Sequence, residues 1–176
     1  GQHRIGHRSH QPDLAAAVDQ AQAFGRQPLT EFGGALDVNG QVWCWGLGSN
    51  GQLGDNAGVQ RLTPTAVLSS GALAGKRVVQ IAAGQAHTCA MTADGGVYCW
   101  GYNFYGQLGD GTSFQRNAPV AVSTSGALAG KKVVQITAGV YHTCALTSDG
   151  KAYCWGDNSD GQVDRLSLRQ QRLRLH

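Results

Sequence analysis

A short stretch that ends in Cys-Trp-Gly occurs three times in this chain and sets its organisation. The three copies are Val42–Gly46, Val97–Gly101 and Ala152–Gly156. Their last tryptophans, Trp45, Trp100 and Trp155, lie 55 residues apart each time. A fixed spacing of this size indicates that one supersecondary unit is repeated along the chain.

The residues around this stretch predict four short strands in every repeat. An Asn-Gly or Asp-Gly pair precedes each copy, and such a pair is a strong hairpin signal because glycine tolerates the positive φ of the turn. These pairs end at Gly40, Gly95 and Gly150. Valine-rich runs that end in glycine, at 78–84 and 133–139, precede two of the hairpins. Runs opened by proline, at 64–67 and 119–122, follow the copies and suit edge strands.

Four antiparallel strands per repeat form the blade of a β-propeller. The 26 glycines and the charged fraction of 14% fit tightly turned β structure, and no apolar run is long enough to span a membrane. We therefore expect an all-β fold, a partial (open) β-propeller of four-stranded antiparallel blades. The repeats number about two and a half, which is too few for a closed ring. We interpret the chain as a fragment of a larger protein and expect it to self-associate through open blade faces.

The repeats are expected to run from 34 to 164, with a non-repeat segment on either side. Residues 1–33 include an alanine-rich run over 14–24, which predicts a short helix, and three histidines that we interpret as solvent-exposed. Residues 165–176 contain four arginines and no acidic residue, and they account for the formal charge of +3. Such a tail could contact phosphate, but we interpret it as a solvated end and do not expect nucleic-acid binding.

A glycine-rich loop follows the first two Cys-Trp-Gly stretches, at 48–55 and 102–110. Neither loop ends in Gly-Lys-Ser/Thr, and no helix pattern follows, so neither is a phosphate loop. We predict that the glycines form turns and that Leu53 and Leu108 anchor the loops in the core.

The five cysteines fall at equivalent places in the repeats. In a hairpin centred on Asp94, Cys89 lies opposite Cys99, and Cys144 lies opposite Cys154 in the next copy, which predicts two disulfides in an oxidising compartment. Cys44 would lie opposite Gly34 and is therefore expected to be an unpaired thiol.

Two other readings of these residues remain open. His87, Cys89 and Cys99 share one strand face and could ligate zinc, although no fourth ligand recurs nearby. His87 could also activate a cysteine nucleophile. Residues copied in every unit serve what every unit needs, namely folding, whereas a catalytic site is normally single. We therefore expect no catalytic residues, no metal, no cofactor and no small-molecule substrate.

Residues that differ between the copies are better candidates for function. Tyr102, Phe104 and Tyr105 stand where the first copy has Leu47, Ser49 and Asn50 and the third has Asp157, Ser159 and Asp160. Three aromatic residues on one loop are typical of a partner-binding surface. The alternative is that they pack against the adjacent blade.

The repeats resemble those of the regulator of chromosome condensation family. The matching pattern is Val-Val-Gln-Ile-x-Ala-Gly, His-Thr-Cys-Ala-Leu, Asp-Gly, Tyr-Cys-Trp-Gly and Asn-x-x-Gly-Gln-Leu-Gly-Asp, between Gly34 and about Asp164. Members of this family include an exchange factor for a nuclear GTPase that also binds nucleosomes, a plant ultraviolet-light receptor and a secreted bacterial inhibitor of β-lactamase. The light receptor uses Gly-Trp-Arg-His, whereas this chain has Gly-Gln-Ala-His at 84–87 and Gly-Val-Tyr-His at 139–142, which disfavours light reception. The cysteine-containing repeats look like those of bacterial extracellular and surface proteins.

The resemblance and the residues together predict a non-enzymatic scaffold that binds an unknown protein partner. We expect a bacterial protein that is secreted or displayed at the cell surface. The alternative is an intracellular, cytoplasmic guanine nucleotide exchange factor or chromatin-binding propeller. Fold resemblance by itself does not choose between them.

Overall fold

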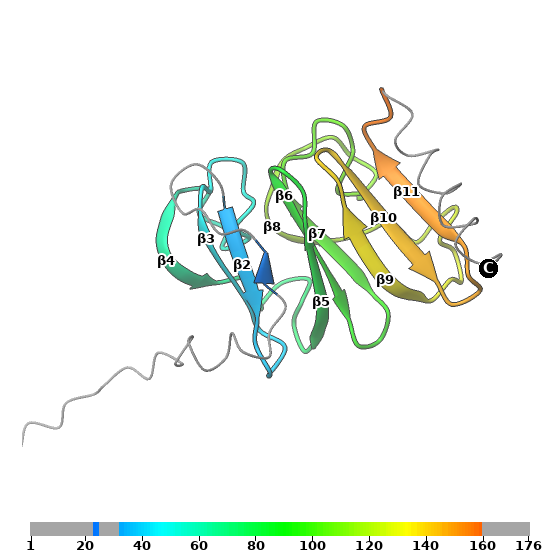
Figure 1. Cartoon of the computed structure of the whole chain (residues 1–176), viewed down its shortest axis with the longest axis horizontal. Coiled ribbons are helices and arrows are strands. Elements are labelled where there is room, and N and C mark those ends of the chain that lie inside the picture. The colour runs from blue at the N-terminus through cyan, green and yellow to red at the C-terminus, as the bar shows by residue number, and fades with distance from the viewer. Residues whose placement is uncertain (1–22, 25–31, 160–176) are drawn as a thin grey trace, which may run out of the picture.

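The computed structural model describes residues 23–24 and 32–159, which form three antiparallel β-sheets (Figure 1). Blade 1 contains β1 (Ala23–Phe24), β2 (Phe32–Leu36), β3 (Val42–Gly46) and β4 (Arg61–Ala66). Blade 2 contains β5 (Val78–Ala83), β6 (His87–Thr92), β7 (Val97–Gly101) and β8 (Arg116–Ala121). Blade 3 contains β9 (Val133–Ala138), β10 (His142–Thr147) and β11 (Ala152–Gly156).

The three sheets follow one another in chain order, side by side, as blades of a propeller do (Figure 1). In blades 1 and 2 the strands pair in sequence order, and β9, β10 and β11 do the same in blade 3. The all-β fold and the partial propeller that the repeats predict are therefore confirmed. Pro64 and Pro119 lie on β4 and β8, the edge strands of their sheets, where a missing N–H costs no ladder bond.

Glycine at the hairpin turn sets the strand register. Gly95 has a φ of +83°, and its N–H donates to the carbonyl oxygen of Thr92. The turn places Cys89 opposite Cys99, as the sequence predicts. The same turn at Gly150 places Cys144 opposite Cys154.

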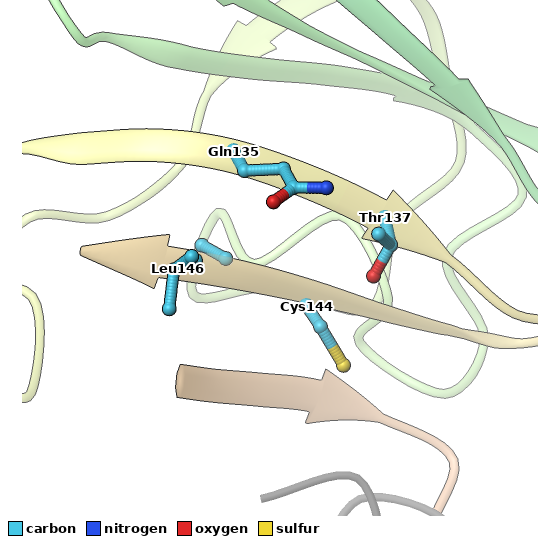
Figure 2. A pocket seen from close by; sticks show the side chains of 5 residues that line it. Gln135, Thr137, Cys144 and Leu146 are labelled. Carbon is cyan, nitrogen blue, oxygen red and sulfur yellow. The ribbon is translucent and has the colours of Figure 1, made fainter. Parts of the chain in front are cut away.

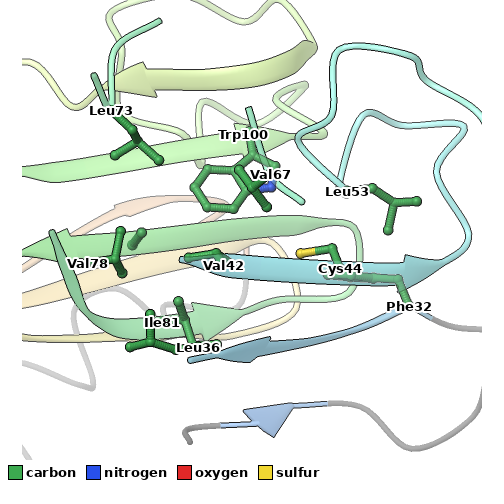
Figure 3. Packing of buried hydrophobic residues seen from close by; sticks show 11 residues of the cluster. Phe32, Leu36, Val42, Cys44, Leu53, Val67, Leu73, Val78, Ile81 and Trp100 are labelled. Carbon is green, nitrogen blue, oxygen red and sulfur yellow. The ribbon is translucent and has the colours of Figure 1, made fainter. Parts of the chain in front are cut away.

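The core lies between the blades rather than within one of them. Trp100 projects from blade 2 toward blade 1 and is completely buried (Figure 3). Around it lie Val42 from β3, Leu53 from the first glycine-rich loop and Val67, which follows β4. The following cluster, between blades 2 and 3, contains Leu108 in the place of Leu53. Both leucines are buried, which confirms that they anchor their loops.

The N-terminal part of the first sheet differs from the expectation. Ala23 and Phe24 were expected at the end of a helix over 14–24, but they form β1 and pair with Ala35 and Gly34 of β2. Pairing with an available strand edge overrides the weak helix preference of an alanine-rich segment. The rest of that expected helix, the N-terminal histidines and the tail at 165–176 lie outside the described residues. The expected start of the repeats at 34 falls within β2.

The described part of the chain contains no helix that is both long and apolar enough to cross a membrane.

Candidate functional site

The boundary between two blades is held by a tryptophan and a threonine that share one backbone carbonyl. The Trp155 indole N–H donates to the carbonyl oxygen of Gln107 at 3.0 Å, and the Thr143 hydroxyl donates to the same oxygen at 2.8 Å. A Cβ on Gly109 would lie 2.6 Å from the indole nitrogen of Trp155, so only glycine fits here. These contacts fix the second glycine-rich loop, at 102–110 in blade 2, against blade 3.

A glutamine side chain forms a second link across the same boundary. The Gln80 amide donates to the carbonyl oxygen of Ile136 at 3.2 Å, and its own oxygen accepts the Ile136 N–H at 2.9 Å. The side chain thus pairs with both backbone groups of one residue in β9. Nothing in the spacing of the repeats indicates this bidentate contact.

His87 is a buried structural residue at this boundary. Its Nε2 lies 3.0 Å from Thr143 Oγ1, and that hydroxyl already donates to Gln107, so the neutral ring must donate from Nε2. Nδ1 is buried without a hydrogen-bond partner among the described residues. Burial, followed by the proximity of His142, lowers the pKa of His87 to about 4. The basic lone pair of the ring is therefore on Nδ1, and no cysteine lies within hydrogen-bond distance of that nitrogen among the described residues.

The cysteine pairs lie where the sequence predicts them. Cys89 and Cys99 are within bonding distance of each other, with Cα atoms 4.1 Å apart, and so are Cys144 and Cys154. In this arrangement neither Cys89 nor Cys99 offers a thiolate to a zinc ion. No group of three or more metal-binding side chains occurs among the described residues.

Cys44 is buried opposite Gly34 and has no cysteine to pair with in the described part of the chain. Burial and, to a smaller extent, the nearby Asp55 carboxylate raise the pKa of its thiol well above the usual range. The thiol is therefore protonated at neutral pH, which makes it a poor nucleophile.

The side of blade 3 that faces away from blade 2 has a shallow pocket, lined by Gln135, Thr137, Cys144, Ala145 and Leu146 (Figure 2). Its volume of about 10 Å³ is no larger than one water molecule requires. Gln135 is exposed here, whereas its counterpart Gln80 reaches the next blade. We call this surface the open face of blade 3, since no further blade follows in the described residues.

The aromatic loop of blade 2 joins a ring from blade 3 to form a cluster. Tyr105 lies 5.1 Å from Tyr141 and 5.3 Å from Phe104, measured between ring centroids. Tyr102 lies 6.4 Å from Phe104 and 6.1 Å from Tyr141. We call these four residues the aromatic cluster. The rings contact the adjacent blade, as the alternative for this loop predicts, and two of them also remain exposed, so partner binding by the loop stays a prediction.

Exposure within the cluster is uneven. Phe104 is 69% exposed and Tyr105 is 43% exposed, while Tyr102 is half-buried. An exposed phenylalanine beside a partly exposed tyrosine is a costly surface to leave in water, and it is typical of a protein-binding patch.

The loop below the cluster is held by buried polar side chains. Asn103 is fully buried, and its amide donates to the carbonyl oxygens of Thr112 and Phe114 at 3.1 and 3.0 Å. The buried Gln107 accepts the Tyr105 N–H at 3.0 Å through Oε1. The exposed rings are therefore presented by a fixed backbone rather than by a loose loop.

Tyr141 was not identified from the sequence. It lies in the turn between β9 and β10, and its counterpart in blade 2 is Ala86. The signal was available, because this position also differs between the copies. What the sequence could not show is that the turn of one blade lies beside the loop of the previous blade.

Charge is unevenly distributed along the blades. Among the described residues of the loops at the cluster end, 84–87, 101–110, 139–142 and 156–159, there are two aspartates and no lysine or arginine. Asp157 is the one next to the cluster, because its N–H donates to the Tyr141 carbonyl oxygen at 2.9 Å. The lysines gather at the opposite hairpin end, where Lys76 pairs with Asp94 and Lys131 pairs with Asp149.

Comparisons with known proteins agree with this architecture. A model of the regulator of chromosome condensation (RCC1) repeat matches residues 39–91 and 94–146, and a second model of that repeat matches 78–107 and 133–162. The human E3 ubiquitin-protein ligase HERC2 is 38% identical over 134 residues, which are 74% of this chain and 3% of HERC2.

Two solved structures share the fold and part of the sequence. The crystal structure of human WBSCR16 superposes with a TM-score of 0.68 at 32% identity, over 77% of this chain and 32% of that one. The structure of Prp20p from Saccharomyces cerevisiae, described with its binding properties to Gsp1p and histones, has a TM-score of 0.63 at 28% identity, over 80% of this chain and 34% of that one.

The chain thus spans about a third or less of the length of these relatives, which are human and yeast proteins. The bacterial origin expected from the paired cysteines is not borne out, because a cross-strand cysteine pair is a local feature of a hairpin and does not specify a source. Two copies of the repeat model, three blades and the two solved propellers lead to the same assignment. The chain belongs to the family of proteins built from regulator of chromosome condensation (RCC1) repeats.

Proposed function

We propose that this chain is a non-enzymatic scaffold that binds a partner protein through the aromatic cluster. The observation that carries the proposal is the exposure of Phe104 and Tyr105 on a loop fixed from below by Asn103 and Gln107. Aromatic side chains contribute a large share of binding energy at protein interfaces, and a fixed backbone lowers the entropy cost of binding.

The polar residues that recur in the repeats have structural roles, which supports a non-enzymatic function. Thr143 and its counterpart Thr88 each hold a loop carbonyl of the preceding blade. Asp94 and Asp149 accept hydrogen bonds from lysine side chains and from backbone N–H groups of their own turns. Each of these groups therefore holds a loop or a turn of the repeats in place.

The two cross-strand cysteine pairs support an oxidising compartment for this protein, outside the cell or on its surface. Disulfides persist in such compartments and are rare where glutathione keeps thiols reduced. Mass spectrometry after alkylation of the protein in its native cell tests this part of the proposal. Alkylation of all five cysteines would contradict it.

A second candidate is suggested by the similarity to Prp20p, which is described with its binding to Gsp1p and histones. In this alternative the chain acts inside the cell as part of a guanine nucleotide exchange factor or a chromatin-binding propeller. Release of a fluorescent GDP analogue from Gsp1p, measured with and without this chain, separates the candidates. The exchange-factor reading predicts faster release, and the scaffold reading predicts no change.

A photo-crosslinking experiment tests the scaffold directly. A benzophenone amino acid replaces Phe104 in one version of the chain and Leu62 in the other, since Leu62 is 74% exposed but lies on β4 of blade 1. Both versions are irradiated in an extract of the native cells. We expect a discrete crosslinked protein from position 104 and none of that mass from position 62. Equal products from the two positions would contradict a binding site at the cluster.

A further inference from the structure

The charged residues around the aromatic cluster favour a positively charged ligand. The four rings of the cluster come from two blades, and the Asp157 N–H donates to the backbone carbonyl oxygen of Tyr141 at 2.9 Å. The Asp157 carboxylate accepts hydrogen bonds at 3.0 Å from the Ser159 N–H and the Ser159 hydroxyl, which fix its orientation. The loops around it, over the ranges given above, contribute no lysine or arginine. Arg116, at the start of β8, is paired with the buried Asp110 through a bond of 2.9 Å, so its charge is already compensated.

Aromatic faces attract cations because the ring quadrupole is negative above and below the plane. Arginine suits such a surface better than lysine, since its planar guanidinium stacks on rings and also donates paired hydrogen bonds to a carboxylate. Tyr105 is 43% exposed, Tyr102 and Tyr141 are half-buried, and Asp157 is joined to Tyr141 through their backbones.

We propose that the aromatic cluster, together with Asp157, binds an arginine side chain from an extended basic segment of the partner protein. The inference rests on the proposed function and adds the chemistry of the partner to it. The position of the lysines supports it: Lys76 and Lys131 lie at the opposite end of the blades, so neither of these two lysines repels a basic segment at the cluster end.

The first and second glycine-rich loops share their architecture but differ in their aromatic residues. The Asn50 N–H in the first loop donates to Gln52 Oε1 at 2.9 Å, which is the counterpart of the hydrogen bond from the Tyr105 N–H to Gln107 Oε1 in the second loop. At the positions of Phe104 and Tyr105, however, the first loop has Ser49 and Asn50. The loop architecture is therefore shared, and only the copy at the boundary of blades 2 and 3 carries the rings.

An NMR titration tests the proposal with the whole chain and a defined probe. The probe is the peptide Gly-Arg-Gly-Arg-Gly with blocked ends, and the control peptide has citrulline, which keeps the shape but not the charge, in place of both arginines. The chain has five tyrosines, so Tyr98 and Tyr153, on the strands β7 and β11, act as internal references for the three in the cluster.

We expect the arginine peptide to shift the ring signals of the cluster in a saturable way, and the citrulline peptide to bind at least about fivefold more weakly. Phe104→Ser should weaken binding by a similar factor, and Asp157→Asn by about threefold, while Leu62→Ser changes nothing. Phe104 is exposed, so its replacement leaves the fold intact, which a melting curve verifies.

Equal binding of the two peptides would overturn the proposal, and so would equal shifts at the two reference tyrosines. Tighter binding of a blocked pentaproline peptide would also overturn it, since the cluster would then recognise proline-rich chains. If position 104 crosslinks to a partner protein but the arginine peptide leaves the rings unchanged, the scaffold function stands and this inference fails. If the peptide binds and no protein crosslinks, the cluster recognises arginine but the scaffold function fails, and the inference about a partner protein fails with it.

Discussion

The indole N–H of Trp100 donates to the backbone carbonyl oxygen of Gln52 at 3.0 Å, across the boundary between blades 1 and 2. The Thr88 hydroxyl donates to the same oxygen at the same distance. One carbonyl in the loop of blade 1 thus fixes two residues of blade 2, and Gln107 does the same for blade 3. The spacing of the tryptophans along the sequence is therefore also the spacing of these hydrogen bonds between blades.

Replacing Trp100 with phenylalanine should destabilise the chain by about 2–3 kcal/mol, because it removes a buried hydrogen bond and leaves a cavity. The matched control is Trp155→Phe, which removes the equivalent bond from a half-buried position and should cost less. Urea denaturation followed by tyrosine fluorescence measures both. Equal losses would contradict the role assigned to burial at the blade boundary.

Removing the Gln80 side chain should also destabilise the boundary of blades 2 and 3. Gln80→Ala leaves the N–H and carbonyl of Ile136 without their side-chain partner, at a cost of about 1–3 kcal/mol. Gln135→Ala is the control, since the same residue type lies exposed on the open face of blade 3. Its cost should stay within about 0.5 kcal/mol. A larger loss for Gln135→Ala would indicate that the open face is already covered by another copy in solution.

Stability should fall as the pH drops from about 6.5 to about 4, owing to His87. Its folded-state pKa is lowered to about 4, while the unfolded chain has the ordinary value of 6.5, so acid protonates the unfolded chain first. The contribution is fully present above 6.5, is lost between these two values, and amounts to about 3 kcal/mol.

Chemical denaturation at several pH values, with His87→Gln as the comparison, measures this effect. The variant should be less stable at neutral pH and have a flatter profile between 4 and 6.5. Burial raises the pKa of the Asp110 carboxyl, but hydrogen bonds from Thr112, Arg116 and Asn103 together lower it below its ordinary value, so this group contributes only at more acidic pH. Parallel profiles for the two proteins would exclude His87 as the source.

A third cross-strand disulfide should form when Gly34 is replaced by cysteine. Gly34 lies opposite Cys44 in the same register that places Cys89 opposite Cys99. Oxidised Gly34→Cys should have no thiol that reacts with Ellman's reagent in denaturant, and should be more stable than its reduced form by about 2–3 kcal/mol. Gly34→Ser is the matched control, with one thiol. A reactive Cys44 in the oxidised variant would show that blade 1 has a different register.

The blades were predictable because the strongest local signals agree with the packing. The Asp-Gly turns set the register of the hairpins, and the repeated tryptophan, of which Trp100 is one copy, forms the contact between blades. β1 was not predictable, since Ala23 and Phe24 belong to an alanine-rich run whose local preference is helical. Their strand conformation depends on pairing with Ala35 and Gly34, a contact that spacing does not reveal.

The candidate site was predictable only in part. Tyr102, Phe104 and Tyr105 stood out because they differ from their copies, but Tyr141 reaches them from another blade. Gln80 could not be recognised either, because its copy Gln135 makes no equivalent contact in the described part of the chain. Local signals identify a blade, and three-dimensional placement is needed to know what lies between blades.

Hydrogen exchange tests the central claim most directly. It is measured on the unmodified chain alone and on the same chain with the partner protein that crosslinking at position 104 identifies. The claim is that a partner protein binds at the boundary of blades 2 and 3, at the end that carries the aromatic cluster. We predict slower amide exchange in 101–109 and 139–143 when the partner is bound, with no change in 61–66. Protection confined to blade 1 or to the lysine-bearing hairpins, or no protection anywhere, would contradict it.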